Sequence, residues 1–421
     1  MKKNNRNIII SDKLAPSTGP YSYGVKAGGW VFTAGMLGVD PTGNLVGVTP
    51  GRPDIQAQSR QSLQNIVTVL EALGSSLDRV AKVKGYITDF RYLDRYNVAY
   101  REFFKPPFPA RATVGGGLVR ENAVIEVEAI ATVSGTPHEV RSPKLADWDA
   151  PCAQGGTQVG DLLFTSGHFA RDSKAQLVGR GDIRVQAEQA LDNIGATLEA
   201  AGFEYLDVIK LNGTVPDFYG FKQYNELFAK YFHEPFEARA TMQGNLAMEG
   251  MTIEIEAVAA RGGTKRFVES EIAGMSHFSL KRRPDTIYLK ELHGALAPHS
   301  HGVQWGDLII LCGECGYGPA GRLVGPGDIR AQTRQTMENI RHCMEALGGT
   351  MNDIVKNVVS ITDYRMVPAF NEEYEKYFSP PYPARTTIIT GTAQDQMVLE
   401  IEPIAVIGAS QSATVLIGPA K

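Results

Sequence analysis

One short motif occurs three times in this chain of 421 residues and constrains its fold more than any other feature. Each copy has an asparagine, a proline-containing bend that ends in Ala-Arg, and a segment in which apolar residues alternate with two glutamates. Fourteen positions separate the asparagine from the arginine, and fifteen separate the arginine from the first glutamate, in every copy. Identical spacings in three copies indicate three homologous units. The residues are Asn97, Arg111 and Glu126, then Asn225, Arg239 and Glu254, then Asn371, Arg385 and Glu400.

The repeat extends beyond this motif. Asp54 and Gly74 recur at the offsets of 128 and then 146 positions that also relate the three arginines. The sequence therefore predicts three tandem domains with one longer connector between the second and the third. Apolar residues in that connector favour an arm packed on a neighbouring unit over a flexible linker. The predicted bounds are 12–134, 144–262 and 288–408 for the domains and 263–287 for the connector.

Each unit shows the same alternation of strand-like and helix-like segments. Apolar residues at helical spacing predict a helix from Asp54 to about Leu73, with Asp54 as N-cap and Gly74 just beyond its end. We expect a β-β-α-β-α-β-β order, an α+β fold with helices on one face of a mixed sheet. The expected segments of unit one are strand 30–33, helix 54–73, strand 80–88, helix 93–104, a strand from 111 and strand 123–133; the first strand recurs at 162–165 and 308–311.

Composition narrows the class of protein. The net charge is −4, and no cluster of basic and aromatic residues indicates a nucleic-acid partner. No apolar run approaches the roughly 20 residues of a membrane span. Four cysteines in this length do not form a disulfide framework. We therefore expect a soluble cytoplasmic protein without a nucleic-acid or membrane partner.

The repeated residue types suggest a ligand site. An arginine fork held by a stiff extended segment suits bidentate capture of a carboxylate. A carboxylate beside such a ligand can orient or deprotonate a water, and an asparagine can bind a nitrogen. The alternative is structural: the arginine and glutamate form an ion pair, and the asparagine binds loop backbone. The residues alone leave both interpretations open.

Longer stretches carry a family resemblance. APSTGPYSYGV at 15–25, YNVAYREFF, PPFPAR and VIEVEAIA together resemble the RidA/YjgF family of imine deaminases. The resemblance implies chorismate-mutase-like domains that assemble as a trimer with clefts between them, here as an intramolecular pseudo-trimer. It also implies hydrolysis of enamines and imines such as 2-aminoacrylate to keto acids and ammonia, without cofactor. Carried over, each arginine grips the substrate carboxylate and the first glutamate positions water, paired as Arg111 with Glu126, Arg239 with Glu254 and Arg385 with Glu400. The helix asparagine falls on Asn97, Asn225 and Asn371.

Each unit departs from that family at the lead-in segment. The family has Tyr in a Gly-Pro-Tyr motif, which is Tyr21 in unit one, loosely Ala153 in unit two and His299 in unit three. The family's Ser-Gly-Gln is Ala-Gly-Met in unit one. We therefore expect three unequal clefts, whose altered residues reflect either drift or specialised chemistry. At this motif unit two has Ser166 and His168, and unit three has Cys312 and Glu314, which we take as candidate binding residues.

Two patterns raise the question of a metal. His299 and His301 are close in sequence, and Cys312 and Cys315 form a C-x-x-C pair. No third ligand follows at a suitable spacing, and an isolated C-x-x-C is a weak indication of zinc or redox chemistry. We expect no metal and no cofactor.

The sequence predicts a hydrolase that deaminates a small carboxylated imine or enamine. Its expected partner is a small nitrogen-bearing carboxylated metabolite, and its expected state is a monomeric pseudo-trimer or a higher homo-oligomer. A pathway-specific deaminase or amidohydrolase that acts on a cyclic or aromatic C–N bond is one alternative. A metabolite-binding protein without turnover is the other.

Overall fold

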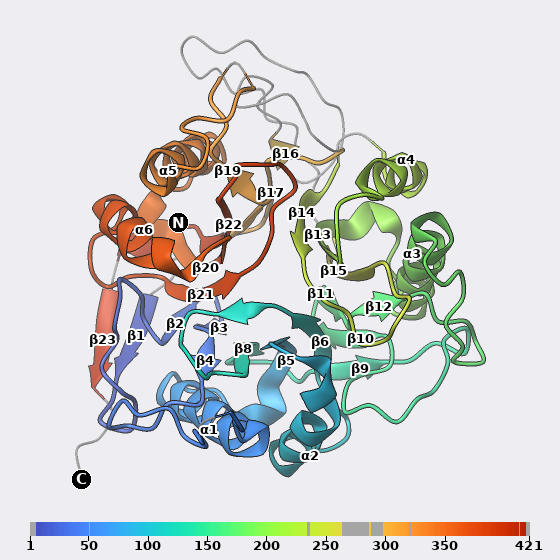
Figure 1. Cartoon of the computed structure of the whole chain (residues 1–421), viewed down its shortest axis with the longest axis horizontal. Coiled ribbons are helices and arrows are strands. Elements are labelled where there is room, and N and C mark those ends of the chain that lie inside the picture. The colour runs from blue at the N-terminus through green and yellow to red at the C-terminus, as the bar shows by residue number, and fades with distance from the viewer. Residues whose placement is uncertain are drawn as a thin grey trace.

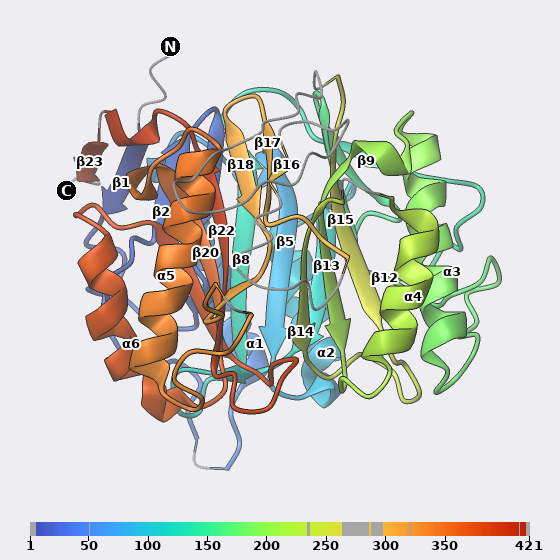
Figure 2. The same ribbon diagram turned by 90° about the horizontal axis from the view of Figure 1, so that it is seen from above.

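Three similar units surround a central axis in the computed structural model of the chain (Figure 1). Their sheets form an inner ring and their long helices lie outside it, as the perpendicular view also shows (Figure 2). The expected intramolecular pseudo-trimer of α+β domains is confirmed. The structure describes residues 6–49, 51–233, 236–262, 286–287, 298–319, 321–411 and 413–417, so the expected arm at 263–287 lies outside the described residues except for its last two.

Unit one has the predicted order of elements, and its sheet order is β2-β3-β8-β5-β6, with β4 paired to β8. β5 and β6 run parallel, and the other neighbours are antiparallel, so the sheet is mixed. The last strand of the unit therefore lies in the middle, and the strand with Arg111 lies at an edge. The elements are β2 (Gly24–Ala27), β3 (Trp30–Thr33), β4 (Met36–Leu37), α1 (Ile55–Ala72), β5 (Val80–Ile87), α2 (Leu93–Phe103), β6 (Ala110–Gly115) and β8 (Ile125–Thr132).

Units two and three repeat this arrangement. The predicted first strands of both units match the observed β11 and β18. Unit two has β10 (Gly156–Val159), β11 (Leu162–Thr165), β12 (His168–Phe169), α3 (Ile183–Ala200), β13 (Val208–Val215), α4 (Phe221–Tyr231), β14 (Ala238–Gln243) and β15 (Glu254–Ala260). Unit three has β17 (Gly302–Trp305), β18 (Leu308–Leu311), β19 (Glu314–Cys315), α5 (Ile329–Ala346), β20 (Ile354–Ile361), α6 (Val367–Tyr374), β21 (Ala384–Ile389) and β22 (Leu399–Val406).

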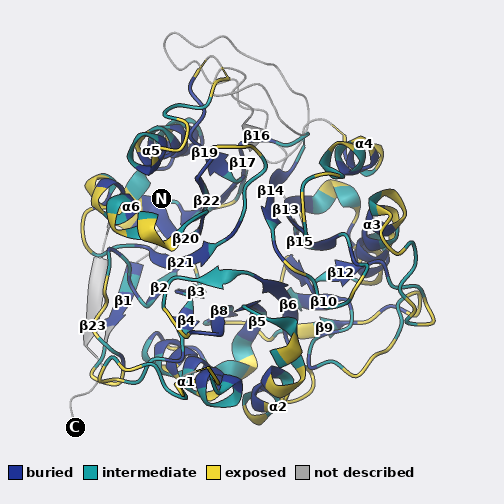
Figure 3. Ribbon diagram, viewed as in Figure 1, coloured by how far each residue is buried: buried dark blue, intermediate teal, exposed yellow. Residues whose placement is uncertain are grey.

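The long helix of unit one begins and ends where its sequence predicts. The Asp54 side chain accepts hydrogen bonds from the backbone N–H groups of Gln56 and Ala57, which have no partner within the helix. Gly74 follows the helix with a φ of 79°, a conformation that favours glycine. Buried residues line one side of the helix and pack on the sheet (Figure 3). Asp182 and Asp328 cap α3 and α5 in the same way.

Short strands that the sequence did not reveal extend the three sheets. β1 (Arg6–Ile10) and β23 (Ala413–Ile417) pair in parallel, so both ends of the described chain join the sheet of unit one. β7 (Gly117–Leu118) of unit one pairs with β21 of unit three. These pairings cover sheet edges and tie the first unit to the last. The remaining short strands are β9 (His138–Val140), which pairs with β10, and β16 (Thr286–Ile287), which pairs with β17.

The second glutamate of each repeat is largely buried, and a lysine of the preceding unit binds it. Lys356 Nζ lies 2.8 Å from Glu128, and its side chain is 4% exposed. The equivalent pairs are Lys82 with Glu256 at 2.6 Å and Lys210 with Glu402 at 2.9 Å. Each lysine also donates to a backbone oxygen of the unit it reaches, namely that of Thr33, Thr165 or Leu311.

Breaking one of these buried pairs is expected to destabilise the whole assembly. Lys356→Met leaves the largely buried Glu128 without its lysine, and loss of one partner costs about 3–5 kcal/mol in buried pairs. The matched control is Arg184→Ala, because Arg184 and Glu226 are 2.6 Å apart but about half exposed, and such pairs contribute about 1 kcal/mol or less. Thermal unfolding of both variants checks the difference. Equal losses of stability would contradict it.

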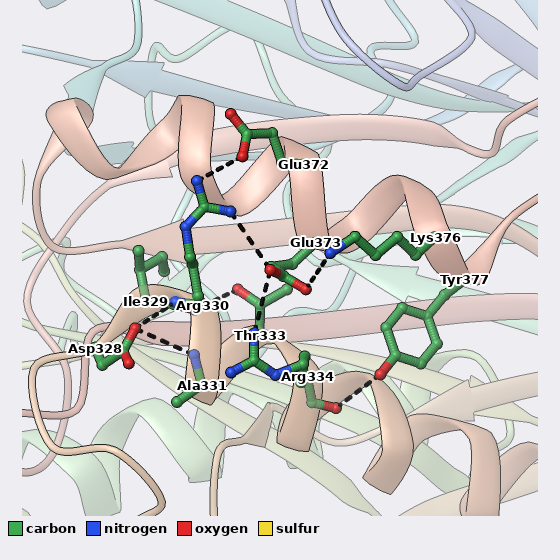
Figure 4. Close-up of polar contacts among 10 residues, drawn as sticks. All are labelled: Asp328, Ile329, Arg330, Ala331, Thr333, Arg334, Glu372, Glu373, Lys376 and Tyr377. Atoms are coloured by element: carbon green, nitrogen blue, oxygen red, sulfur yellow. Dashed lines mark hydrogen bonds and ion pairs between the residues drawn. The ribbon is translucent and has the colours of Figure 1, made fainter.

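A polar network fixes α6, which carries Asn371, onto α5 (Figure 4). Glu373 is 4% exposed and accepts contacts from Arg330, Arg334 and Lys376 at 3.4, 3.1 and 2.8 Å. Three cations around one buried carboxylate hold the helix at a defined height above the sheet. This position matters because α6 borders a cleft between units.

No described helix is long and apolar enough to cross a bilayer.

Candidate functional site

The three candidate sites lie between units, where the arginine strand of one unit meets the lead-in segment of the next. Two backbone hydrogen bonds recur at each junction. In the junction of units three and one, the N–H of Gly35 donates to the carbonyl of Arg385 at 3.2 Å and that of Ser22 to Pro383 at 3.0 Å. The equivalents are Gly167 to Arg111 and Ala153 to Pro109 between units one and two, and Gly313 to Arg239 and Ser300 to Glu237 between units two and three.

This arrangement corrects the predicted pairing of arginine with glutamate. Within unit one, β5 separates the strand of Arg111 from the strand of Glu126, so these side chains belong to different clefts. The first cleft brings Arg385 to Glu126, the second brings Arg111 to Glu254, and the third brings Arg239 to Glu400. Sequence spacing within a unit could not show this, because each arginine lies on an edge strand that is completed by the neighbouring unit.

Aromatic rings hold each arginine. The Arg385 guanidinium lies 5.1 to 5.5 Å from the ring centres of Tyr21, Phe370 and Tyr374. Stacking on ring faces holds a guanidinium through its planar surface and leaves its N–H groups available. The same packing occurs in the other clefts, with Arg111 over Tyr96 and Tyr100 and Arg239 over Phe221, Tyr224 and Phe228.

Buried donors and acceptors without partners face these clefts. Among the described residues, Nη1 of Arg385, Nη1 of Arg111 and Oε2 of Glu126 make no hydrogen bond. No cleft arginine comes within ion-pair distance of its facing glutamate in the described chain, which excludes the structural ion pair that the sequence had left open. Buried polar groups are normally satisfied, so these atoms indicate a ligand site.

The glutamates that face the clefts have pKa values near neutrality, well above the usual value of a carboxyl group. Burial and the neighbouring Glu128 raise the pKa of Glu126 to about 8, although Lys356 and Arg385 oppose the shift. Burial and Glu256 raise the pKa of Glu254 to about 7, and burial and Glu402 raise that of Glu400 to about 8. A carboxyl group in this range can both give and accept a proton at neutral pH.

A glycine lies directly against each of these carboxyl groups. A Cβ atom at Gly35 would lie 1.9 Å from Oε1 of Glu126, and at Gly167 and Gly313 it would lie 2.1 and 1.9 Å from Glu254 and Glu400. None of these glycines has a positive φ. The requirement for glycine is therefore steric, and it explains why this residue is the constant member of the otherwise variable Ala-Gly-Met, Ser-Gly-His and Cys-Gly-Glu triplets.

Gly35→Ala is expected to displace the Glu126 carboxyl group and to abolish function in the first cleft. The overlap also costs about 1–3 kcal/mol of stability, as overpacking does elsewhere. Gly116→Ala is the matched control, because its Cβ would meet only the Ile389 carbonyl oxygen at an ordinary 3.7 Å. Ligand binding and thermal unfolding measure both effects. A Gly35→Ala protein that behaves like Gly116→Ala would contradict the steric role.

The predicted asparagine of the first cleft lies beside its arginine. A Cβ at Gly19 would lie 3.4 Å from Nδ2 of Asn371 and 3.3 Å from Nη2 of Arg385, so both side chains border the same loop of unit one. In the described structure the Oδ1 atoms of Asn97, Asn225 and Asn371 are buried without a hydrogen-bond partner. Beside Arg385, the orphan amide oxygen of Asn371 can accept a hydrogen bond from a ligand nitrogen.

The lead-in residue next to the arginine differs in each cleft. Tyr21 occupies this place in the first cleft and His299 in the third, as predicted. In the second cleft the residue is Cys152, not Ala153, because the backbone bond made by Ala153 is equivalent to that of Ser22. Unit two has one extra residue just before β10, so an alignment of the sequence alone places Ala153 where the structure has Cys152.

Four predicted binding residues contribute to structure instead. The Ser166 hydroxyl donates to the Ala153 carbonyl and accepts from the N–H of Arg111 at 3.3 Å, which joins two units. His168 is buried and contacts the Gly155 carbonyl and the Thr197 hydroxyl. Cys312 and Glu314 are 0% exposed and contact each other, so neither lines the third cleft. They flank the glycine that faces the cleft.

The third cleft contains a pocket whose lining residues were only partly predicted. His299 and Glu400 were expected there, whereas Cys315, Tyr317 and Phe221 were not. Phe221 lies in the helix next to Asn225, and the other two follow Gly313 by a few residues. Phe221 could have been predicted from its position four residues before Asn225, because residues four apart lie on the same face of a helix.

Comparison with known proteins identifies the repeated domain. The model of the family described as Endoribonuclease L-PSP matches residues 12–133, 149–261 and 290–407. A RutC family protein of Pyrococcus horikoshii is 39% identical over 127 residues, which cover 30% of this chain and 97% of the relative. A 2-iminobutanoate/2-iminopropanoate deaminase of Dermatophagoides farinae is 36% identical over 126 residues, which cover 30% of this chain and 95% of that protein.

One solved structure is similar over most of the chain. It is a chorismatase, with a TM-score of 0.53 and 13% identity, and the match covers 78% of this chain and 93% of the chorismatase. At this identity the likeness concerns the fold alone. The three family matches span most of the chain and confirm the resemblance stated from the sequence: the chain belongs to the Endoribonuclease L-PSP family, that of the RidA proteins, and carries its domain three times in tandem.

Proposed function

We propose that the chain hydrolyses a small carboxylated imine or enamine to a keto acid and ammonia. The observation that carries the proposal is the first cleft, where an unpaired Arg385 guanidinium faces a buried Glu126 whose pKa is about 8. A cation with free donors suits a carboxylate, and a carboxyl group that titrates near neutrality suits proton transfer. One relative named as an imine deaminase supports the reaction type.

Arg385 would bind the substrate carboxylate and fix the adjacent carbon beside Glu126. The aromatic rings around the guanidinium limit its motion, so the substrate is oriented before the reaction. The orphan Oδ1 of Asn371 would accept a hydrogen bond from the substrate nitrogen. The carbon–nitrogen double bond then lies between an anchored carboxylate and a proton-transferring group.

Glu126 would serve in turn as acid and base. Protonated Glu126 first gives its proton to the imine nitrogen, and the resulting carboxylate takes a proton from water as that water attacks the carbon. The carbinolamine nitrogen then takes this proton, the C–N bond breaks to release ammonia, and Glu126 recovers a proton from the remaining hydroxyl group. One water is consumed, and one keto acid and one ammonia are formed.

The first cleft is the favoured site because it combines Tyr21, Asn371, Arg385 and Glu126 from two units. The second and third clefts keep the arginine and glutamate but replace the tyrosine with Cys152 and His299. We assign imine hydrolysis to the first cleft and a different ligand to the third, where His299 and Tyr317 border the pocket.

Turnover of 2-iminopropanoate and 2-aminoacrylate by the purified chain tests the proposal, with pyruvate and ammonia as products. A complex with 2-oxobutanoate then identifies which arginine holds a carboxylate, and we expect Arg385. A carboxylate bound without any turnover would favour the metabolite-binding alternative. Turnover only of cyclic or aromatic C–N compounds would favour the amidohydrolase alternative.

A further inference from the structure

Four side chains of metal-binding types gather inside unit three, behind the wall of the third cleft. One carboxylate oxygen, Oε1 of Glu314, lies 2.9 Å from Nδ1 of His301, 3.2 Å from Sγ of Cys312 and 3.6 Å from Sγ of Cys343. The sulfur of Cys312 is also 4.0 Å from Nδ1 of His301. All four side chains are 0% exposed. An imidazole and two thiols thus converge on one buried carboxylate.

The spacing of these atoms is that of a metal centre. Zinc binds nitrogen, oxygen and sulfur at about 2.0 to 2.3 Å in a tetrahedron, which places its ligand atoms about 3.3 to 3.8 Å apart. Four of the separations run from 2.9 to 4.0 Å, and three of these start from the same oxygen of Glu314. The ligand atoms of His301, Glu314 and Cys343 all lie within 4.8 Å of one another.

The other two units provide an internal comparison. At the four equivalent places unit one has Tyr23, Ala34, Met36 and Val69, which are mostly apolar, and unit two has Gly155, Ser166, His168 and Thr197. In unit two the imidazole is satisfied by a carbonyl and a hydroxyl group, without acid or thiol. The fold itself therefore needs neither a carboxylate nor thiols at these places. Unit three has four metal-binding side chains there together.

We infer that His301, Cys312, Glu314 and Cys343 bind one zinc ion in unit three. Binding releases the two thiol protons to solvent, because zinc binds cysteine as the thiolate. The ligands come from the residue before β17, the residue after β18, and from β19 and α5, so the ion joins the sheet to its covering helix. Full burial and four protein ligands indicate a structural centre rather than a catalytic one.

The ion would also fix part of the third cleft. Gly313 lies between two of the ligands, Cys312 and Glu314, and its Cα packs against the Glu400 carboxyl group. His299 borders the third cleft, and its ring centre lies 5.8 Å from that of His301. Because the zinc site borders the third cleft, it does not depend on the deaminase reaction proposed for the first cleft.

Metal analysis of the full chain tests this inference. The protein is produced in zinc-supplemented medium and dialysed, and zinc is measured by mass spectrometry; we expect about one equivalent per chain. Replacement by Co²⁺ is expected to give the near-ultraviolet absorption of cobalt–thiolate bonds. Cys343→Val, which introduces the residue of unit one, and Cys312→Ala are each expected to lower bound zinc about tenfold or more.

Cys315→Ser is the matched control, because Cys315 completes the C-x-x-C pair but contacts Glu400 rather than this cluster. We expect this variant and Cys152→Ser to keep the zinc. Circular dichroism establishes that each variant is folded. If one of Cys343→Val and Cys312→Ala does not fold, the other alone tests the zinc site. A wild-type chain that takes up neither Zn²⁺ nor Co²⁺, or equal zinc loss in Cys315→Ser, would overturn the inference.

Discussion

Arg385→Met is expected to lower kcat/KM for 2-iminopropanoate about 10²- to 10³-fold. Loss of one partner from a charge-assisted pair with a substrate carboxylate costs about 2–5 kcal/mol, and each 1.4 kcal/mol is about a factor of ten. The substitution leaves the aromatic rings in place, so most of the loss reflects the missing fork of donors. Arg385→Lys keeps the charge without the planar fork and is expected to fall between wild type and Arg385→Met.

Because the three clefts lie in one chain, the other arginines serve as matched controls. Arg111→Met and Arg239→Met make the same change in the second and third clefts, against equivalent aromatic rings. We expect both variants to keep kcat/KM within about twofold of wild type, because substitutions in separate clefts share no contacts and act independently. Equal losses from all three substitutions would contradict the assignment of activity to the first cleft. Steady-state assays of keto-acid release decide between these results.

Glu126→Gln is expected to lower kcat about 10²- to 10⁴-fold while the chain still binds 2-oxobutanoate. The amide keeps the shape of the carboxyl group but transfers no proton, and general acid–base catalysis contributes about this much. Calorimetric titration of the ligand separates lost binding from lost turnover. Glu254→Gln and Glu400→Gln make the same change in the other clefts and are expected to leave this activity almost unchanged.

The pH profile provides a second test of Glu126. Its pKa of about 8 means that the free enzyme carries the proton needed for the first step at neutral pH. We therefore expect kcat/KM to fall as pH rises through about 8. A profile that rises through this range instead would require Glu126 to act first as a base.

Glu126→Gln also has a predictable effect on the stability of the folded chain. Burial raises the pKa of Glu126 from 4.5 to about 8, so the folded state favours the protonated form and wild type loses stability as pH rises from about 4.5 through 8. Glutamine resembles the protonated form and escapes this loss. Glu126→Gln should match wild type near pH 4 and exceed it by up to about 5 kcal/mol near pH 9, at about 1.4 kcal/mol per pKa unit. Unfolding at both pH values measures this.

Much of the fold could be predicted from local patterns. The helix from Asp54 to Gly74 was predictable because its cap, its apolar face and its final glycine are encoded within 21 consecutive residues. The first strands matched for a similar reason. The terminal strands β1 and β23 escaped prediction because their partners are about 400 residues apart in sequence, and no local pattern encodes such a pairing.

The candidate site divides in the same way. Its residue types, Arg385, Glu126 and Asn371 with their repeats, were predictable because spacing and repetition mark them. Their partnership was predicted wrongly, since a sequence places Arg111 fifteen positions from Glu126 but does not show that β5 separates them. The role of Gly35 was likewise hidden, because a steric requirement exists only between atoms that the fold brings together.

The sequence by itself therefore determined that the chain carries three copies of one α+β domain with a repeated arginine, glutamate and asparagine. Only the tertiary structure decided that each cleft takes its arginine from one unit and its glutamate from the next. It also showed that Cys343, on a helix about 30 residues from Cys312, joins the His301 cluster. The physical reason is the same in both cases: local periodicity is written along the chain, whereas the chemistry of a site depends on contacts between distant segments.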